Sequence, residues 1–252
     1  MKILYRLYQL FIFVPIFLVL TILTSVCTVI GSVIGNGHFW SYYPGHCWAW
    51  LTVRLLLLPV KVEGREHLDP KQSYIFVANH QGVFDIFLVY GYLNRNFKWM
   101  MKKALEKIPF VGYACKRCHF IMVDRHGASK IRATYDQARA VLREGMSLTV
   151  FPEGARTFTG HMGFFRRGAF MLADELQLPV CPLTINGSFN IMPRMRDWHW
   201  VEWHPMTLTI HEPIFPPEKG REAEKAVMQQ SWDAINGSLV EEYRGYVENK
   251  DQ

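Results

Sequence analysis

The residues between Arg6 and Arg54 include no aspartate, glutamate, lysine or arginine, and this feature constrains the fold more than any other. Within this stretch, Leu10 to Ile34 is almost wholly apolar, and as a helix its 25 residues would be about 37 Å long. The hydrocarbon core of a bilayer is about 30 Å thick, so such a helix is long enough to cross it. A secretory signal peptide would also begin with basic residues, but this run is long for one and Gly31-Ser32-Val33 is a weak cleavage site. We therefore expect the segment to be retained as a membrane anchor.

A second, shorter apolar segment follows an aromatic cluster at residues 39–45, whose composition suits a membrane–water interface. Residues 47–58 are interrupted by Arg54, which favours an interfacial or re-entrant helix over an easy second crossing. Lys2 and Arg6 should stay in the cytoplasm, as should the basic chain beyond residue 60, so zero or two crossings are required. We predict a membrane-associated two-helix hairpin over residues 1–58. It would anchor a catalytic domain of residues 59–252 on the cytoplasmic side of a plasma or inner membrane. A single-pass anchor and a core helix of a soluble domain are the alternatives.

From Pro59 onward, short apolar runs alternate with amphipathic segments, which predicts an α/β fold with a mixed sheet flanked by helices. The predicted strands are Val60–Glu63, Ser73–Ala78, Phe97–Met100, Phe120–Val123, Ser147–Phe151, Val180–Ile185 and Met206–His211. The predicted helices are Val83–Leu93, Pro109–Arg117, Ser129–Arg143, Arg167–Leu176 and Glu222–Val247.

The charge of the chain is concentrated in one part of the predicted catalytic domain. The whole chain carries +6, yet between Arg95 and Glu144 twelve lysines and arginines face only four acids, which suits a phosphate-bearing partner or an anionic bilayer. The five cysteines are odd in number and scattered, which favours a reducing compartment over a disulfide framework. Cys115-x-x-Cys118-His119 is half of a zinc pattern without a second half, so we expect no metal.

A candidate catalytic pair lies where the apolar run Tyr74–Ala78 gives way to a helical pattern. His80 and Asp85 would lie on different sides of an unbroken helix, because five residues correspond to a rotation of about 500°. A bend at Gln81-Gly82 would fold His80 over the first helical turn, so that Asp85 accepts the Nδ1 proton and the other ring nitrogen can take a proton from an alcohol. The alternative is a core histidine with an acidic residue near a helix N-terminus.

A second candidate site follows the predicted strand at residues 147–151. Glu153, Gly154 and Arg156 make a plausible phosphate-binding rim, in which Arg156 offers a bidentate fork, Gly154 allows close backbone approach and Glu153 fixes the guanidinium. Lys102 can reach the same phosphate as a point charge. The alternatives are a surface ion pair, worth under about 1 kcal/mol, and a solvated helix start at the lysine.

Four blocks together resemble the glycerolipid acyltransferase family, in the order that this family shows. They are Asn79-His80-x4-Asp85, residues 102–112 leading to Val123-Asp124-Arg125, Phe151-Pro152-Glu153-Gly154-Ala155-Arg156, and residues 178–187. The likeness covers about residues 60 to 190. The chain departs from the family at Ala155, where threonine is usual, and this departure bears on the identity of the acceptor.

The resemblance implies an acyl transfer to the sn-2 hydroxyl of 1-acylglycerol-3-phosphate, which gives phosphatidic acid. His80 would be the base, oriented by Asp85, and no covalent acyl-enzyme would form. Arg156 and Lys102, supported by Glu153 and Gly154, would hold the acceptor phosphate. Acyl-CoA or acyl carrier protein would be the co-substrate, with no cofactor, and the remaining partners would be the lysophospholipid and the bilayer, without nucleic acid.

Three other functions are compatible with the same residues. The acceptor can be another lysolipid, such as a lyso-ornithine lipid, or glycerol-3-phosphate itself. A catalytically silent lipid-binding relative would keep the fold without needing His80 and Asp85. A thioester hydrolase would release free acid instead of an esterified lipid.

Overall fold

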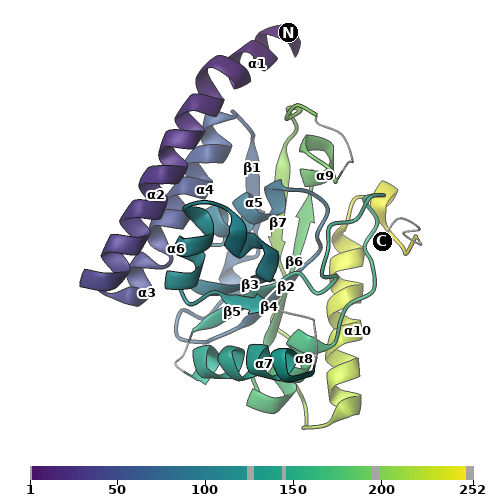
Figure 1. Ribbon diagram of the computed structural model, residues 1–252. Coiled ribbons are helices and arrows are strands. Elements are labelled where there is room, and N and C mark those ends of the chain that lie inside the picture. The colour runs from purple at the N-terminus through teal and green to yellow at the C-terminus, as the bar shows by residue number, and fades with distance from the viewer. Residues whose placement is uncertain (1, 124–127, 144–145, 195–198, 248–252) are drawn as a thin grey trace.

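The computed structural model describes residues 2–123, 128–143, 146–194 and 199–247. Within them a seven-stranded sheet forms the centre of the molecule, with the strand order β1-β7-β6-β2-β5-β3-β4 (Figure 1). β6 and β7 are antiparallel and all other neighbours are parallel, so the sheet is mixed, as predicted. The strands are β1 Val60–Glu63, β2 Ile75–Ala78, β3 Phe97–Lys102, β4 Ile121–Val123, β5 Ser147–Val150, β6 Val180–Asn186 and β7 Met206–Ile210.

Helices flank this sheet on both faces and along one side (Figure 1). The α-helices are α1 Lys2–Tyr8, α2 Val14–Ile34, α3 Gly37–Trp40, α4 Tyr43–Leu55, α5 Phe84–Tyr92, α6 Val111–Arg117, α7 Ala128–Arg143, α8 Gly168–Leu176, α9 Ser188–Ile191 and α10 Arg221–Ser238. A π-helical turn, Gln9–Phe13, joins α1 to α2, and Arg65–His67, Lys103–Lys107 and Glu241–Tyr243 are 3-10 turns. The π-helical turn comes just before Pro15, which has no amide hydrogen to continue a regular α-helical ladder.

The N-terminal helices form a hairpin in which α2 and α4 lie side by side (Figure 1). The indole of Trp48 in α4 donates a hydrogen bond to the Thr21 hydroxyl of α2 over 3.0 Å. Gly31 allows the Trp40 ring to pack directly on α2, because a Cβ at position 31 would come within 2.1 Å of that ring. The hairpin thus has specific packing of its own.

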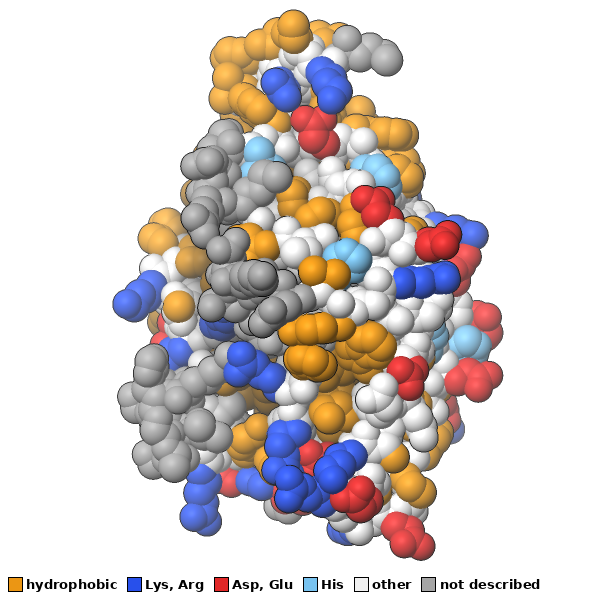
Figure 2. Space-filling view, turned by 90° about the vertical axis from the view of Figure 1, so that its right-hand side faces the viewer, with side chains coloured by type: hydrophobic (Ala, Val, Ile, Leu, Met, Phe, Trp, Pro, Cys, Tyr) orange, Lys and Arg blue, Asp and Glu red, His pale blue; other side chains and the backbone are white. Residues whose placement is uncertain are grey.

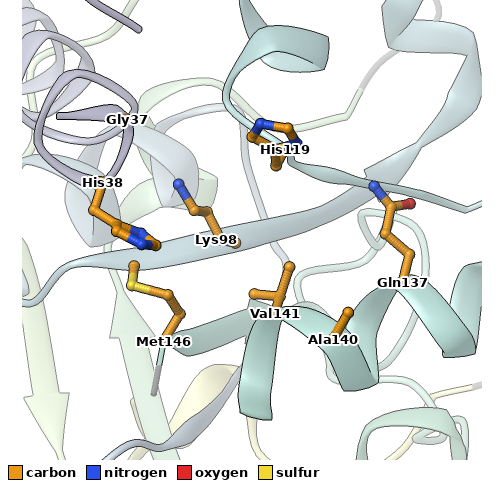
Figure 3. Close-up of a pocket in the computed structure, with 8 residues that line it drawn as sticks. All are labelled: Gly37, His38, Lys98, His119, Gln137, Ala140, Val141 and Met146. Atoms are coloured by element: carbon orange, nitrogen blue, oxygen red, sulfur yellow. The ribbon is translucent and has the colours of Figure 1, made fainter. Parts of the chain in front are cut away.

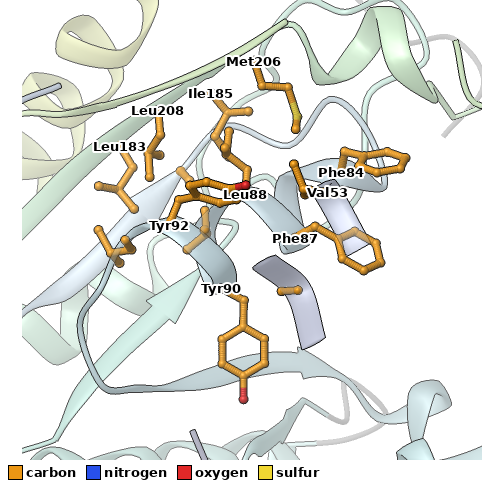
Figure 4. Close-up of a cluster of buried hydrophobic side chains, with 14 of the residues drawn as sticks. Val53, Phe84, Phe87, Leu88, Tyr90, Tyr92, Leu183, Ile185, Met206 and Leu208 are labelled. Carbon is orange, nitrogen blue, oxygen red and sulfur yellow. The ribbon is translucent and has the colours of Figure 1, made fainter. Parts of the chain in front are cut away.

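Two hydrophobic clusters cover the two faces of the sheet, and β2 contributes to both. Phe76 and Ala78 point into the cluster shared with α4 and α5, whereas Ile75 and Val77 point into the cluster shared with α7, α8 and α10. This is the alternation expected along a strand, and burial on both faces explains why β2 is apolar throughout. In the first cluster, Val53 of α4 lies beside Leu88 of α5, close to side chains of β6 and β7 (Figure 4). The predicted hairpin therefore contributes α4 to the core that supports α5.

One predicted helix is too long. The pattern at residues 222–247 predicts a single helix, but α10 ends at Ser238. Leu239 takes an extended backbone conformation and is buried, so the chain turns inward at this residue. Gly237 and Ser238 are weak helix formers, which lets the burial of one apolar side chain end the helix.

Candidate active site

The turn between β2 and α5 brings His80 and Asp85 together. Nδ1 of His80 lies 2.7 Å from Oδ2 of Asp85, and the same oxygen accepts the backbone N–H groups of Gln81 at 2.7 Å and Gly82 at 2.9 Å. Asp85 is completely buried, whereas the His80 side chain keeps 13% of its surface exposed. With Nδ1 donating to the carboxylate, Nε2 is left as the nitrogen that can accept a proton.

Residues from the β5 side hold the His80 ring and backbone. The ring stacks on Phe151, with centroids 3.9 Å apart and planes at 10°. The carbonyl of His80 accepts a hydrogen bond from the backbone N–H of Thr157 at 3.0 Å. Phe151 stacks in turn on Trp99 of β3 at 5.7 Å. The orientation of the imidazole therefore depends on three neighbouring parallel strands.

Asn79 and Gly82 shape the turn itself. The Asn79 side chain donates to the carbonyl of Ile185 at 2.9 Å and accepts its N–H at 2.8 Å, which fastens the end of β2 to β6. Gly82 pairs with Pro193 in an antiparallel bridge, and a Cβ at position 82 would lie 2.6 Å from the carbonyl oxygen of Ser188. Only a residue without a side chain fits at this contact.

Glu153 has a different position from the one expected. Its two carboxyl oxygens accept the backbone N–H of His80 and that of Gly163, each at 2.7 Å. Among the described residues it forms no ion pair with Arg156, so the prediction that Glu153 fixes the guanidinium is wrong. Glu153 is buried, and this burial raises the pKa of its carboxyl to about 8, although the two N–H donors pull the pKa downward. The residue therefore joins the His80 turn to the loop around Gly163.

Gly154 and Arg156 continue the same loop after β5. Gly154 has φ of +78°, a conformation that a residue with a side chain rarely adopts, and its N–H closes a turn onto the carbonyl of Phe151 at 3.0 Å. Arg156 is partly buried, and its guanidinium has no hydrogen bond or ion pair with the described part of the chain. Burial lowers the pKa of this guanidinium, Asp85 opposes that effect, and the positive charge of Arg194 adds to it. A cation with Asp85 and Arg194 nearby is thus left without a direct partner.

Lys102 is the last residue of β3 and is exposed. Because β2, β5 and β3 are parallel, it lies at the same edge of the sheet as His80 and the loop after β5. Within the described part of the chain, the hydrogen bonds of His80, Glu153 and Arg156 do not involve Lys102. Its predicted role at the phosphate stays a prediction.

Two cavities of the described chain lie away from these residues. One of about 370 Å³ is lined by Lys98, His38, His119 and side chains of α7 (Figure 3). Lys98 is near the amino end of β3, so this cavity lies toward the sheet edge opposite His80. A second, of about 630 Å³, surrounds the start of α10. Neither of these two cavities is lined by His80, Asp85 or Arg156, which follow strands at the carboxyl edge of the sheet.

Arg194 is a neighbour of Arg156 that the sequence did not reveal. Its guanidinium lies over the Phe158 ring at 4.0 Å and donates to the carbonyl of Arg156 at 2.9 Å. It follows the fourth motif block by several residues and has no motif of its own, so its place beside Arg156 depends on the fold alone.

Residues 59–186 match the family model described as Acyltransferase, which is half of the chain. A 1-acyl-sn-glycerol-3-phosphate acyltransferase of Chlamydomonas reinhardtii is 30% identical over 188 residues, 72% of this chain and 56% of that protein. The 1-acyl-sn-glycerol-3-phosphate acyltransferase alpha of Ovis aries is 32% identical over 143 residues, 53% of this chain and 50% of its own. The chain spans about half the length of the curated relatives it matches.

The similarity to a solved structure covers nearly the whole chain. A crystal structure of the 1-acyl-sn-glycerophosphate (LPA) acyltransferase PlsC from Thermotoga maritima matches with a TM-score of 0.77 at 25% identity. The match includes 94% of this chain and 96% of that one. The family model, the relatives and this neighbour agree with the motif blocks, and the chain belongs to the acyltransferase family.

Proposed function

We propose that this protein transfers a fatty acyl group from acyl-CoA or acyl carrier protein to the sn-2 hydroxyl of 1-acylglycerol-3-phosphate. The observation that carries the proposal is the hydrogen-bonded pair of His80 and Asp85, with the guanidinium of Arg156, which forms no hydrogen bond or ion pair with the described residues, in the adjoining loop. An acceptor that carries a hydroxyl and a phosphate needs a base to take the hydroxyl proton and a cation to bind the phosphate. The names of the relatives support this acceptor, because several are 1-acyl-sn-glycerol-3-phosphate acyltransferases.

The proposed reaction is a direct transfer between the two substrates. Nε2 of His80 takes the proton of the acceptor hydroxyl while its oxygen attacks the thioester carbonyl. The tetrahedral intermediate collapses, the carbon–sulfur bond breaks, and the imidazolium returns the proton to the departing thiolate. Asp85 holds the imidazole in the required tautomer and stabilises its positive charge in between.

Arg156 would bind the acceptor phosphate through charge-assisted hydrogen bonds. The loop that carries it is tied to the base, because the N–H of Thr157 donates to the carbonyl of His80. A phosphate held on this loop would keep its glycerol hydroxyl near the imidazole. Positioning of this kind accounts for a large part of enzymatic rate enhancement.

The proposal includes a membrane location for the N-terminal hairpin. The helical segment Lys2–Ile34 is long and apolar enough to cross a bilayer, and little of its most apolar part is buried against the protein. Large apolar side chains, such as Leu18 and Leu23, are about half exposed along it. Lys2 and Arg6 at its start pair with Glu202. The uppermost part of the molecule in Figure 2 carries many hydrophobic side chains. We propose residues 1–58 as the anchor and residues 59–252 as the catalytic part on the cytoplasmic side.

One assay tests the activity. The full-length protein in detergent micelles is given a labelled acyl thioester and, separately, lysophosphatidate, lyso-ornithine lipid and glycerol-3-phosphate. We expect labelled phosphatidic acid from the first acceptor at the highest rate. Free labelled fatty acid as the main product would indicate a hydrolase, and no turnover of any acceptor would indicate a silent lipid-binding protein.

A further inference from the structure

We propose that Arg194 is a second cationic group for the acceptor, so that Arg156 and Arg194 together select a phosphate monoester dianion. The inference rests on the proposed function and assigns specificity to a residue outside the motif blocks. It starts from the Arg194 guanidinium, which the fold places against the backbone of Arg156, in the same loop environment as the Arg156 guanidinium.

The segment that carries Arg194 is fastened to the catalytic turn. The carbonyl of Met192 accepts the N–H of Val83 at 3.2 Å, and Pro193 pairs with Gly82. Arg194 then reaches across to the Arg156 carbonyl at 2.9 Å. One short segment therefore contacts both the turn between His80 and Asp85 and the loop that bears Arg156.

The Arg194 guanidinium is held in place with most of its donors unused. One face lies on Phe158 at 4.0 Å, and one nitrogen, Nη1, donates to the Arg156 carbonyl. Among the described residues it has no other hydrogen bond and no ion pair. A guanidinium has five N–H donors, so several remain for a ligand. Stacking on an aromatic ring limits its motion and lowers the entropic cost of using them.

The two cations repel each other until an anion joins them. Arg194 contributes to lowering the pKa of Arg156, which shows that the two charges are close enough to interact. A phosphate monoester carries about 1.5 to 2 negative charges at pH 7 and presents three strong acceptor oxygens. A diester headgroup has one charge and an uncharged glycerol headgroup has none. The pair of arginines therefore favours the monoester, because the two negative charges of the phosphate offset the positive charges of both guanidinium groups.

The experiment compares two acceptors that carry the same acyl chain, 1-acylglycerol-3-phosphate and the uncharged 1-acylglycerol. The kcat/KM of each is measured for the wild-type protein and for Arg194→Ala, Arg194→Lys and Arg194→Gln, together with the KM of the thioester donor. Arg95→Ala is the matched control, because Arg95 also lies over an aromatic ring, Tyr74, and donates to one backbone carbonyl, that of Gln72. Thermal melting checks that each variant folds.

We expect Arg194→Ala to lower kcat/KM for the phosphate acceptor by about 10- to 100-fold, the value of a hydrogen bond to a charged group. The uncharged acceptor, the donor KM and the Arg95→Ala control should stay near wild type. Lysine should restore more of the preference for phosphate than glutamine, which keeps an amide donor for the Arg156 carbonyl but lacks the charge.

Equal losses with both acceptors, or a glutamine variant as selective as the lysine variant, would mean that Arg194 only supports the loop, and would overturn the inference. Unchanged selectivity in Arg194→Ala would do the same while leaving the proposed function intact. A wild-type protein that prefers the uncharged acceptor would overturn both.

Discussion

The imidazole of His80 is the group on which the proposed chemistry depends. Replacing His80 with alanine removes the base, and we expect kcat to fall by about 10²- to 10⁴-fold. The backbone N–H groups of Gln81 and Gly82 still bond Asp85 in this variant, so the turn should keep its form. Measurement of kcat together with the melting temperature checks both points. Near-wild-type turnover would refute the assignment of the base.

Asp85→Asn separates the charge of this residue from its shape. The amide oxygen can still accept the Gln81 and Gly82 N–H groups, while the imidazolium formed during catalysis loses its counter-charge. We expect a loss of kcat with little change in melting temperature. A variant that loses its fold and its activity together would assign Asp85 a structural role instead.

Glu153 is expected to act through the position of the backbone. In Glu153→Gln, one of the two carboxyl oxygens becomes an NH2 group. This NH2 group then faces the backbone N–H of His80 or that of Gly163, so two donors meet and neither has an acceptor. An unsatisfied buried group costs about 1–3 kcal/mol, so the free energy of unfolding should fall by that order. Urea unfolding of both proteins measures the difference, and an unchanged midpoint would contradict it.

The difference in stability between the wild-type protein and Glu153→Gln should depend on pH. The pKa of Glu153 is raised from 4.5 to about 8 in the folded protein, mainly by burial, so the folded state holds a proton that the unfolded state has lost. The contribution of Glu153 to stability is then fully present below about pH 4.5 and is lost as the pH rises through about 8. We expect the stability difference between wild type and Glu153→Gln to shrink as the pH rises through this window. A difference that grows with pH would show that the folded protein prefers the carboxylate form of Glu153.

At the scale of secondary-structure elements, the site is a junction between the end of β2, the start of α5 and the loop after β5. The strands were predicted within one or two residues at their ends, because each is a short run of apolar residues between turn-forming residues. The pairing order of the strands was not predictable, since central strands that are buried on both faces have no distinguishing pattern. That order is what places Phe151 under His80 and fastens Asn79 to Ile185.

Gly82→Ala tests the close contact between this junction and the segment around α9. The new Cβ would lie 2.6 Å from the Ser188 carbonyl, so we expect a destabilisation of about 1–3 kcal/mol and reduced activity. Gly237→Ala is the control, because nothing lies within 4 Å of its Cβ position and alanine favours a helix by about 0.5–1 kcal/mol. Melting temperatures that fall equally in the two variants would contradict the importance of the contact.

At the scale of the whole molecule, the N-terminal hairpin has one face on the rest of the fold and one face with exposed apolar side chains. Within the hairpin, Tyr5 and Tyr8 donate to the carbonyls of Leu56 and Leu55. Gln9 exchanges hydrogen bonds with the backbone of Val201, outside the hairpin, and Trp203 donates to the carbonyl of Leu57. The hairpin is thus held to the fold by polar as well as apolar contacts. This arrangement would keep the site at a defined height relative to a bilayer.

Aspartate on the exposed face should weaken membrane binding without unfolding the protein. We expect Leu18→Asp combined with Leu23→Asp to reduce flotation with phospholipid vesicles, because each aspartate costs about 2.5–3.5 kcal/mol at the centre of a membrane helix. Both leucines are exposed, so the melting temperature in detergent should change little. Phe215→Asp, which removes an exposed aromatic outside the hairpin, is the control. Flotation of the double variant equal to wild type would contradict the membrane role of this face.

The amino-acid sequence by itself determined the features that depend on neighbours in the chain. The apolar helix, the strand positions and the meeting of His80 with Asp85 follow from composition and from a spacing of five residues across one bend. Only the tertiary structure decided the rest of the site. It placed Glu153 on the His80 backbone and Arg194 on Arg156. Such contacts join segments that are distant in the chain, and they arise from the order in which strands pair, which local propensity and periodicity do not specify.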